Sequence, residues 1–137
     1  MSRKLKVLVV DDSLIMRVNL VRSLESIGHE VVGEANNGKA GITAYDQYKP
    51  DLVTMDITMP DMDGITAVTK IKELDSEADI IMVTSHGQEA MVMNALKAGA
   101  KGYILKPISP EKLREAIGKI FPELENVATD EFLDDEL

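Results

Sequence analysis

The chain has 137 residues, of which 45% are apolar and 28% charged, a composition typical of one soluble globular domain rather than of a disordered or fibrous chain. It contains no cysteine, which excludes disulfides, thiolate metal sites and cysteine nucleophiles. Its net charge of −9 argues against a nucleic-acid partner, because such binding depends on neutralising phosphates.

Short apolar segments alternate with amphipathic segments five times along the chain. Residues 5–10 are β-branched and almost continuously apolar, which predicts a strand buried on both faces. A helix is predicted between an N-cap at Ser13 and a glycine just past its C-terminus at Gly28. The elements predicted next are a strand at 31–32, a helix with Ile42, Tyr45 and Tyr48 that ends near 49–50, a strand at 52–55, a helix with Ile65, Val68, Ile71 and Leu74, a strand at 80–83, a helix at 90–98, a strand at 103–105 and a helix at 109–121. This alternation predicts right-handed crossovers and an α/β fold, a doubly wound parallel sheet with helices on both faces.

Polar residues directly follow four of the predicted strands, at the edge where open parallel sheets place their active sites. They are Asp11 and Asp12 after the first strand, Asp56 after the third, Thr84 after the fourth and Lys106 after the fifth. Each has a structural alternative: Asp12 and Thr84 as helix caps, Asp56 as a turn residue, and Lys106 as a solvated amine.

The set as a whole suggests more specific chemistry. If the first and third strands are neighbours, three carboxylates meet, and they repel one another unless a cation or proton intervenes. Mg²⁺ prefers oxygen ligands of this kind, while Lys106 offers a positive charge and Thr84 a hydroxyl to a phosphate. The combination suits phosphoryl transfer. No Walker loop is present, and neither His29 nor His86 is placed for an acyl-transfer triad.

Several motifs are distributed over residues 5–121 in an order and with a spacing that are typical of one protein family. They are Asp11-Asp12-Ser13 with Met16-Arg17, Pro50-Asp51-Leu52-Val53, Met55-Asp56 through Asp63-Gly64, Val83-Thr84-Ser85, and Ala98-Gly99 through Tyr103 leading to Lys106-Pro107. With these motifs the chain resembles the receiver domain of bacterial two-component response regulators, of the single-domain CheY type. The resemblance implies a five-stranded sheet in the order 2-1-3-4-5 within a flavodoxin-like three-layer α/β/α fold.

The resemblance also implies a role for each site residue. Asp56 is the phospho-acceptor, with a sensor histidine kinase as donor, and Mg²⁺ is bound by Asp12, Asp56 and the backbone carbonyl of Thr58, with Asp11 acting through water. Thr84 and Lys106 contact the phosphoryl group, and the Lys106–Pro107 peptide bond is cis. Tyr103 corresponds to the switch aromatic of the family, although it could also be an edge-strand residue that covers apolar surface.

Two further positions tune the lifetime of the acyl phosphate in this family. They are Thr58 and His86, and neither has an acidic or amide side chain that would orient a hydrolytic water. We therefore expect slow self-dephosphorylation, with no further enzymatic activity.

We expect a receiver domain at 1–121 and an acidic extension at 122–137, with no effector domain attached. Residues 121–137 contain seven carboxylates and no Lys or Arg. The extension is interpreted as a disordered acidic tail, an added helix packed on the body, or an acidic–apolar peptide that a partner recognises.

The output of such a chain is expected to be a protein contact. The predicted surface comprises the helix at 90–98, the strand at 103–105 and the helix at 109–121, with Met91, Val92, Met93, Lys101 and Tyr103. One of the two methionines is expected to pack inward. Alternatively, the two form a contact patch that adapts to a partner protein.

Three functions are weighed. The first is a chemotaxis-type switch, and the second is a phosphorelay carrier that passes phosphate to a histidine phosphotransferase. An aspartyl-phosphate hydrolase is disfavoured because such enzymes place Asp-x-Asp after the first strand, whereas here the two aspartates are adjacent. No apolar run is long enough for a signal peptide or a membrane span, so we expect a cytoplasmic location without membrane insertion.

Overall fold

The computed structural model describes residues 3–85 and 87–124, in which five strands alternate with five helices. The strands are β1 (Lys6–Val10), β2 (Glu30–Ala35), β3 (Leu52–Asp56), β4 (Ile80–Thr84) and β5 (Gly102–Leu105). The helices are α1 (Leu14–Ser26), α2 (Gly38–Tyr48), α3 (Gly64–Leu74), α4 (Glu89–Ala98) and α5 (Pro110–Ile120). Every predicted strand and helix is therefore confirmed, and most bounds agree to within one residue. The largest difference is β2, which has six residues where the sequence predicted a strand only at 31–32.

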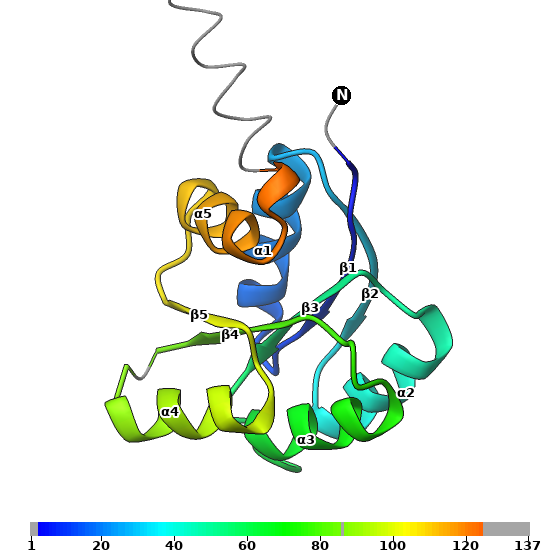
Figure 1. Ribbon diagram of the computed structural model, residues 1–137, viewed down its shortest axis with the longest axis vertical. Helices are drawn as coiled ribbons and strands as arrows, with labels where there is room; N and C mark the ends of the chain where they lie inside the picture. The colour runs from blue at the N-terminus through cyan, green and yellow to red at the C-terminus, as the bar shows by residue number, and fades with distance from the viewer. Residues whose placement is uncertain (1–2, 86, 125–137) are drawn as a thin grey trace, which may run out of the picture.

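The five strands form one parallel sheet in the order β2-β1-β3-β4-β5. Helices α1 and α5 cover one face of this sheet, and α2, α3 and α4 cover the other (Figure 1). The three-layer α/β/α architecture and the strand order are those that the sequence resemblance implies.

Two apolar clusters fill the space on the two sides of the sheet, and β1 contributes to both. Val7 and Val9 belong to the cluster under α1 and α5, whereas Leu8 and Val10 belong to the cluster under α2 and α3. All four side chains are almost completely buried, as expected for a central strand of a parallel sheet. The prediction of a strand buried on both faces is confirmed.

The local signals for the helix ends also match the structure. Ser13 caps α1, since its Oγ accepts a hydrogen bond from the Met16 backbone N–H at 3.2 Å. Gly28 follows α1 with a φ of 94°, a left-handed conformation that favours glycine. Two residues of the predicted apolar stripes are not buried. Tyr48 and Leu74 are the last residues of α2 and α3, and they remain 44% and 55% exposed.

His29 has a structural role, which agrees with its exclusion from the candidate site. Its side chain is 8% exposed, and Nδ1 accepts a hydrogen bond from the Leu5 backbone N–H at 3.1 Å. Burial lowers the pKa of this imidazole below its ordinary value of 6.5. Within residues 3–85 and 87–124, no helix combines the length and the apolar character needed to cross a membrane.

Candidate functional site

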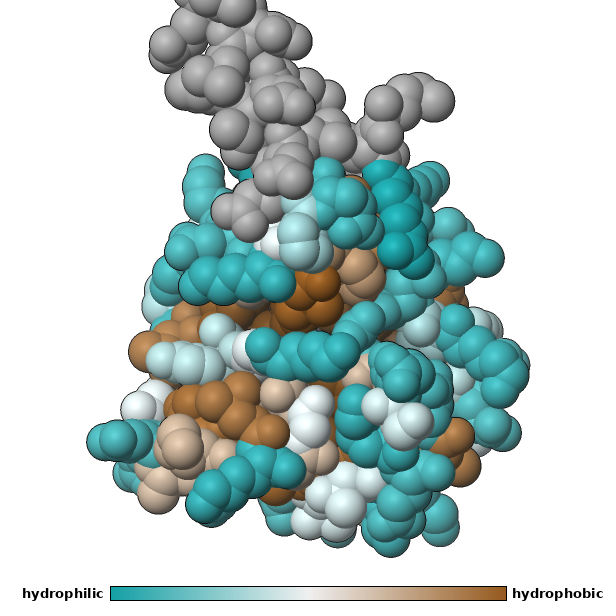
Figure 2. Space-filling view, viewed as in Figure 1, coloured by the Kyte–Doolittle hydropathy of each residue, from teal (hydrophilic) through white to brown (hydrophobic). Residues whose placement is uncertain are grey.

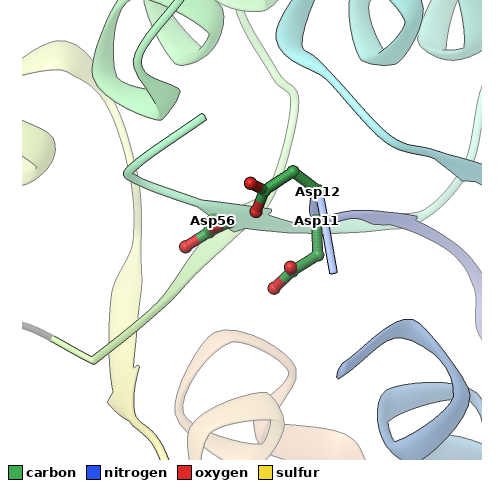
Figure 3. Close-up of side chains that lie close together, drawn as sticks. All are labelled: Asp11, Asp12 and Asp56. Atoms are coloured by element: carbon green, nitrogen blue, oxygen red, sulfur yellow. The ribbon is translucent and has the colours of Figure 1, made fainter. Parts of the chain in front are cut away.

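The predicted acidic cluster forms at the carboxyl edge of the two central strands. Val10 of β1 lies opposite Met55 of β3, so the residues that follow them, Asp11 and Asp56, come side by side. Figure 3 shows the side chains of Asp11, Asp12 and Asp56 directed into the same space. One carboxylate oxygen from each lies within 4.8 Å of the other two. The convergence expected from the sequence is therefore confirmed.

Lys106 supplies the positive charge of the site. Its Nζ lies 3.1 Å from Asp11 Oδ2 and 3.5 Å from Asp56 Oδ1, and its side chain is only 15% exposed. The Lys106 backbone N–H donates to the Thr84 carbonyl at 2.8 Å, which holds the start of this loop against β4. The Lys106–Pro107 peptide bond is cis, as the resemblance implies.

The two neighbouring aspartates differ in how much of their carboxylate is already engaged. Asp11 is completely buried, and its Oδ1 accepts the Ser13 backbone N–H at 2.9 Å while its Oδ2 accepts Lys106 Nζ. Asp12 is exposed beside it. Asp11 is thus fixed by the protein, whereas Asp12 faces the solvent from which a cation would arrive.

This environment raises the pKa of Asp56 from its ordinary value of 3.8 to about 6. Burial is the main cause, and the negative charge of Asp11 adds to it. The Lys106 ammonium acts in the opposite direction, while a hydrogen bond with Asp12 raises the pKa further. The site therefore holds more negative charge than Lys106 neutralises.

The donor set fits a hard divalent cation. All three clustered side chains offer carboxylate oxygens, and Mg²⁺ typically takes one or two such ligands together with water and phosphate oxygens. Among residues 3–85 and 87–124, only carboxylate oxygens belong to the cluster, a donor set that suits hard cations. Because both oxygens of Asp11 are engaged, Asp12 and Asp56 are the direct ligands that the contacts favour.

The other predicted site residues occupy the same edge of the sheet or its border. Thr84 is the last residue of β4, is 1% exposed and pairs in register with Leu105, one residue before Lys106. Tyr103 is 47% exposed on the edge strand β5, and Thr58 is exposed in the loop after β3. His86 lies outside the described residues, so the expected slow dephosphorylation stays a prediction.

Arg17 is a site residue whose role was not predicted, since it was noted only as part of a motif. Its Nη1 donates to the Asp11 carbonyl at 2.7 Å, and its Nε donates to Glu34 Oε1 at 3.2 Å. The side chain is 14% exposed, so the guanidinium braces the backbone beneath the acidic cluster. A position in the first turn of α1 was the available signal, but the partners belong to distant segments.

Gly64 explains how the loop after Asp56 can return so closely to β3. Its N–H donates to the Ile57 carbonyl at 2.6 Å, and a Cβ at this position would lie 2.0 Å from the Asp56 carbonyl oxygen. The neighbouring atoms belong to the backbone and have little freedom to move aside.

A Gly64→Ala variant should therefore lose stability and displace Asp56. We expect a loss of about 1–3 kcal/mol in the free energy of unfolding, measured by urea denaturation. Gly102→Ala is the matched control, because no atom lies within 4 Å of its added Cβ. Equal stability of the two variants would contradict this account of the loop.

Comparisons with known proteins agree with this geometry. A family model described as the response regulator receiver domain matches residues 7–118. The chemotaxis protein CheY of Thermotoga maritima is 48% identical over 115 residues, which cover 84% of this chain and 96% of that relative. CheY of Bacillus subtilis is 49% identical over 114 residues, or 83% and 95% of the two chains.

Solved structures show the same architecture. A chain from the CheX–CheY–BeF₃–Mg²⁺ complex of Borrelia burgdorferi superposes with a TM-score of 0.82 at 36% identity, covering 85% of this chain and 88% of that one. A CheY-like receiver domain protein from Methanospirillum hungatei gives a TM-score of 0.80 at 30% identity, with 90% and 98% covered.

Proposed function

This chain belongs to the response regulator receiver family, and from that premise we propose that it is a phosphorylation-dependent switch in chemotaxis signalling with Asp56 as its phospho-acceptor. The observation that supports this most directly is the position of Asp56 between two other carboxylates and the Lys106 ammonium. Nothing in the structure or the comparisons favours the phosphorelay alternative.

The transfer step requires one bond to form and one to break. A carboxylate oxygen of Asp56 forms a bond to the phosphorus of a phosphohistidine on a sensor kinase, or of a small phosphodonor. The bond between phosphorus and the leaving group breaks, and for phosphohistidine the departing nitrogen keeps the electron pair. Receiver chemistry depends mainly on positioning and charge neutralisation, which agrees with the absence of any acyl-transfer triad from the sequence.

Asp12, Asp56 and the Thr58 carbonyl are the groups that would hold Mg²⁺, with Asp11 beside them. When bound, the ion neutralises charge on the phosphoryl oxygens and on the acidic cluster. Lys106 is placed to pair with the phosphoryl group, because its Nζ already lies 3.5 Å from the acceptor carboxylate. Thr84 lies at the end of the adjacent strand, and we assign its hydroxyl to a phosphoryl oxygen.

Phosphorylation acts as a switch because it changes the charge that Lys106 and Thr84 face. The acyl phosphate adds negative charge and acceptor oxygens at Asp56, so conformations that bring those two residues toward it gain stability. Tyr103 lies on the same strand as Leu105, next to Lys106, and is the residue that we expect to respond. The output surface is formed by α4, β5 and α5. There Met93 is exposed and Met91 packs inward, as predicted for one of the pair.

Phosphoryl uptake tests this function directly. The protein is incubated with acetyl phosphate and Mg²⁺, and its mass and the modified peptide are determined by mass spectrometry. We expect one phosphoryl group on the peptide that contains Asp56, and none when a chelator removes Mg²⁺. Absence of label, or label on another residue, would refute the assignment.

A further inference from the structure

A groove between α4, β5 and α5 has the chemistry to bind an acidic–apolar peptide. It has a volume of about 520 Å³, and its floor includes Leu96, Tyr103 and Leu105. These three side chains are 40%, 47% and 41% exposed, so a substantial apolar surface faces solvent here. Figure 2 shows hydrophobic side chains gathered over α4 and β5, bordered by hydrophilic ones.

The border of the groove is basic. Lys101, Lys112 and Lys119 line it together with one acidic residue, Glu115. Lys101 already pairs with Asp79 at 2.7 Å, so Lys112 and Lys119 are the main cations available to a ligand. The Nζ of Lys112 donates to the carbonyls of Leu105 and Pro107 at 3.3 and 2.9 Å, which holds that ammonium at the end of the groove. Lys119 is 73% exposed and lies 3.9 Å from Glu115, a weak surface pair that a stronger anion can displace.

The last segment of the chain has the complementary pattern. Residues 125–137 contain six carboxylates and no Lys or Arg. Within them the apolar pair Phe132-Leu133 is enclosed by Asp130-Glu131 on one side and Asp134-Asp135-Glu136 on the other. An apolar pair between acidic runs matches an apolar floor between lysines.

The point at which the segment leaves the domain allows it to reach this groove. Leu124 packs against the cluster under α1 and α5, and Glu123 pairs with Arg3 at 3.6 Å, so the chain leaves at the Lys119 end of α5. The eight residues from Leu124 to Phe132 can span about 26–29 Å when extended. The 11 residues of α5 are about 16 Å long, so Phe132 can reach any part of a groove that runs beside this helix.

We propose that residues 125–137 bind in cis to the groove between α4, β5 and α5, with Phe132 and Leu133 on its apolar floor and the flanking carboxylates on its lysines. Attachment to the domain gives the segment a local concentration of about 1 mM, so modest contacts suffice. The docking does not depend on phosphorylation. Its consequence, that a partner using this surface must displace the segment, rests on the proposed function.

The absence of cysteine makes a site-specific distance measurement possible. In the full chain, Thr129→Cys carries a single nitroxide spin label, and the loss of amide signal is read by two-dimensional NMR. We expect the amides of Tyr103, Leu105, Ala116 and Lys119 to fall to about half their intensity or less, as a populated tethered complex requires. Replacing Phe132 and Leu133 by Ser in the labelled chain should restore them.

The same NMR measurement tests whether the groove lysines contribute to binding and whether the segment binds within its own chain or to another copy. Lys119→Glu should weaken the signal loss in the groove, whereas Lys70→Glu, the same change on an exposed residue of α3, should leave it unchanged. No loss in the groove, or loss centred on the exposed Leu14 and Ile15 of α1, would overturn the proposal. Loss in an isotope-labelled chain that lacks the spin label, mixed with spin-labelled chain, would overturn it in favour of binding between copies. Because no phosphodonor is present, failure here is separate from failure of phosphoryl uptake.

Discussion

The Asp56→Asn protein is expected to be more stable than the natural protein, and to take up no phosphoryl group. In the natural protein, burial and the charge of Asp11 raise the pKa of Asp56 to about 6, so an ionised Asp56 destabilises the folded state. The rise from 3.8 to about 6 corresponds to about 3 kcal/mol at 1.36 kcal/mol per pKa unit. Although Asp56 is only 6% exposed, the exposed Asp12 beside it admits solvent that screens these charges, so we expect a smaller gain of about 1–2 kcal/mol in metal-free buffer.

The stability difference between Asp56→Asn and the natural protein should depend on pH, because the pKa of Asp56 is higher in the folded state than in the unfolded state. Well below pH 3.8, Asp56 is protonated in both the folded and the unfolded state, so the two proteins should be equally stable there apart from the amide substitution, and the difference should already be emerging at pH 4. The folded natural protein then holds its proton up to about pH 6, whereas the unfolded chain releases it near 3.8, so the deficit grows across this interval and is complete above it. Urea denaturation at pH 4, 5, 6 and 8 measures this difference.

Asp63→Asn is the matched control for this substitution. Asp63 lies in the same loop, but its carboxylate caps α3 by accepting the Thr66 N–H at 2.9 Å, a role that asparagine also fills. This variant should show little change in stability and normal phosphoryl uptake. Addition of Mg²⁺ should stabilise the natural protein and Asp63→Asn but have far less effect on Asp56→Asn. A destabilised Asp56→Asn protein would contradict the repulsion that the geometry indicates.

The acidic cluster was predictable because parallel strands end on one edge of a sheet. The apolar runs before Asp11 and Asp56 indicate strands, and adjacency of those strands is then enough to bring the carboxylates together. Adjacency itself did not follow from periodicity. The order β2-β1-β3-β4-β5 came from the family resemblance, since several orders satisfy the same alternation of strands and helices.

The division of roles within the cluster was implied by the family resemblance and did not follow from the residue pattern, because it depends on side-chain contacts between distant segments. Asp11 and Asp12 are equivalent in the sequence, yet the backbone turn at Ser13 engages one oxygen of Asp11 and Lys106 engages the other. Arg17 likewise joins the Asp11 carbonyl to Glu34, a residue of the neighbouring strand β2. The exposure of the last residues of α2 and α3 could not be predicted from periodicity either. The periodic pattern places Tyr48 and Leu74 on the buried stripe, but it does not show at which residue the helix extends beyond the side chains that would bury it.

Lys106 and a bound Mg²⁺ should compete for the same negative charge, so Lys106→Met is expected to bind Mg²⁺ more tightly. The ammonium lies within 3.5 Å of both Asp11 and Asp56, and methionine keeps much of the unbranched stem while removing the charge. Two unit charges 4 Å apart interact by about 1 kcal/mol in water and about 4 kcal/mol at an effective dielectric constant of 20. Asp11 and Asp56 are almost completely buried, but the third carboxylate of the cluster, Asp12, is exposed to solvent, so we expect a change of at least the lower value, which is about fivefold in affinity.

The measurement should be made at pH 8. Loss of Lys106 also removes the influence that lowers the pKa of Asp56, so the carboxyl of the variant holds its proton to a higher pH than about 6, and near neutrality that proton competes with the metal. Calorimetric titration of the natural protein, Lys106→Met and Lys119→Met compares these effects. Lys119→Met has the same change in net charge on an exposed residue of α5 and should bind Mg²⁺ as the natural protein does. Tighter Mg²⁺ binding combined with loss of the response to phosphorylation would separate the two roles of the site, because Lys106 opposes the metal but is needed to recognise the phosphoryl group. Unchanged or weaker Mg²⁺ binding by Lys106→Met at pH 8 would show that the ammonium and the metal do not share this charge.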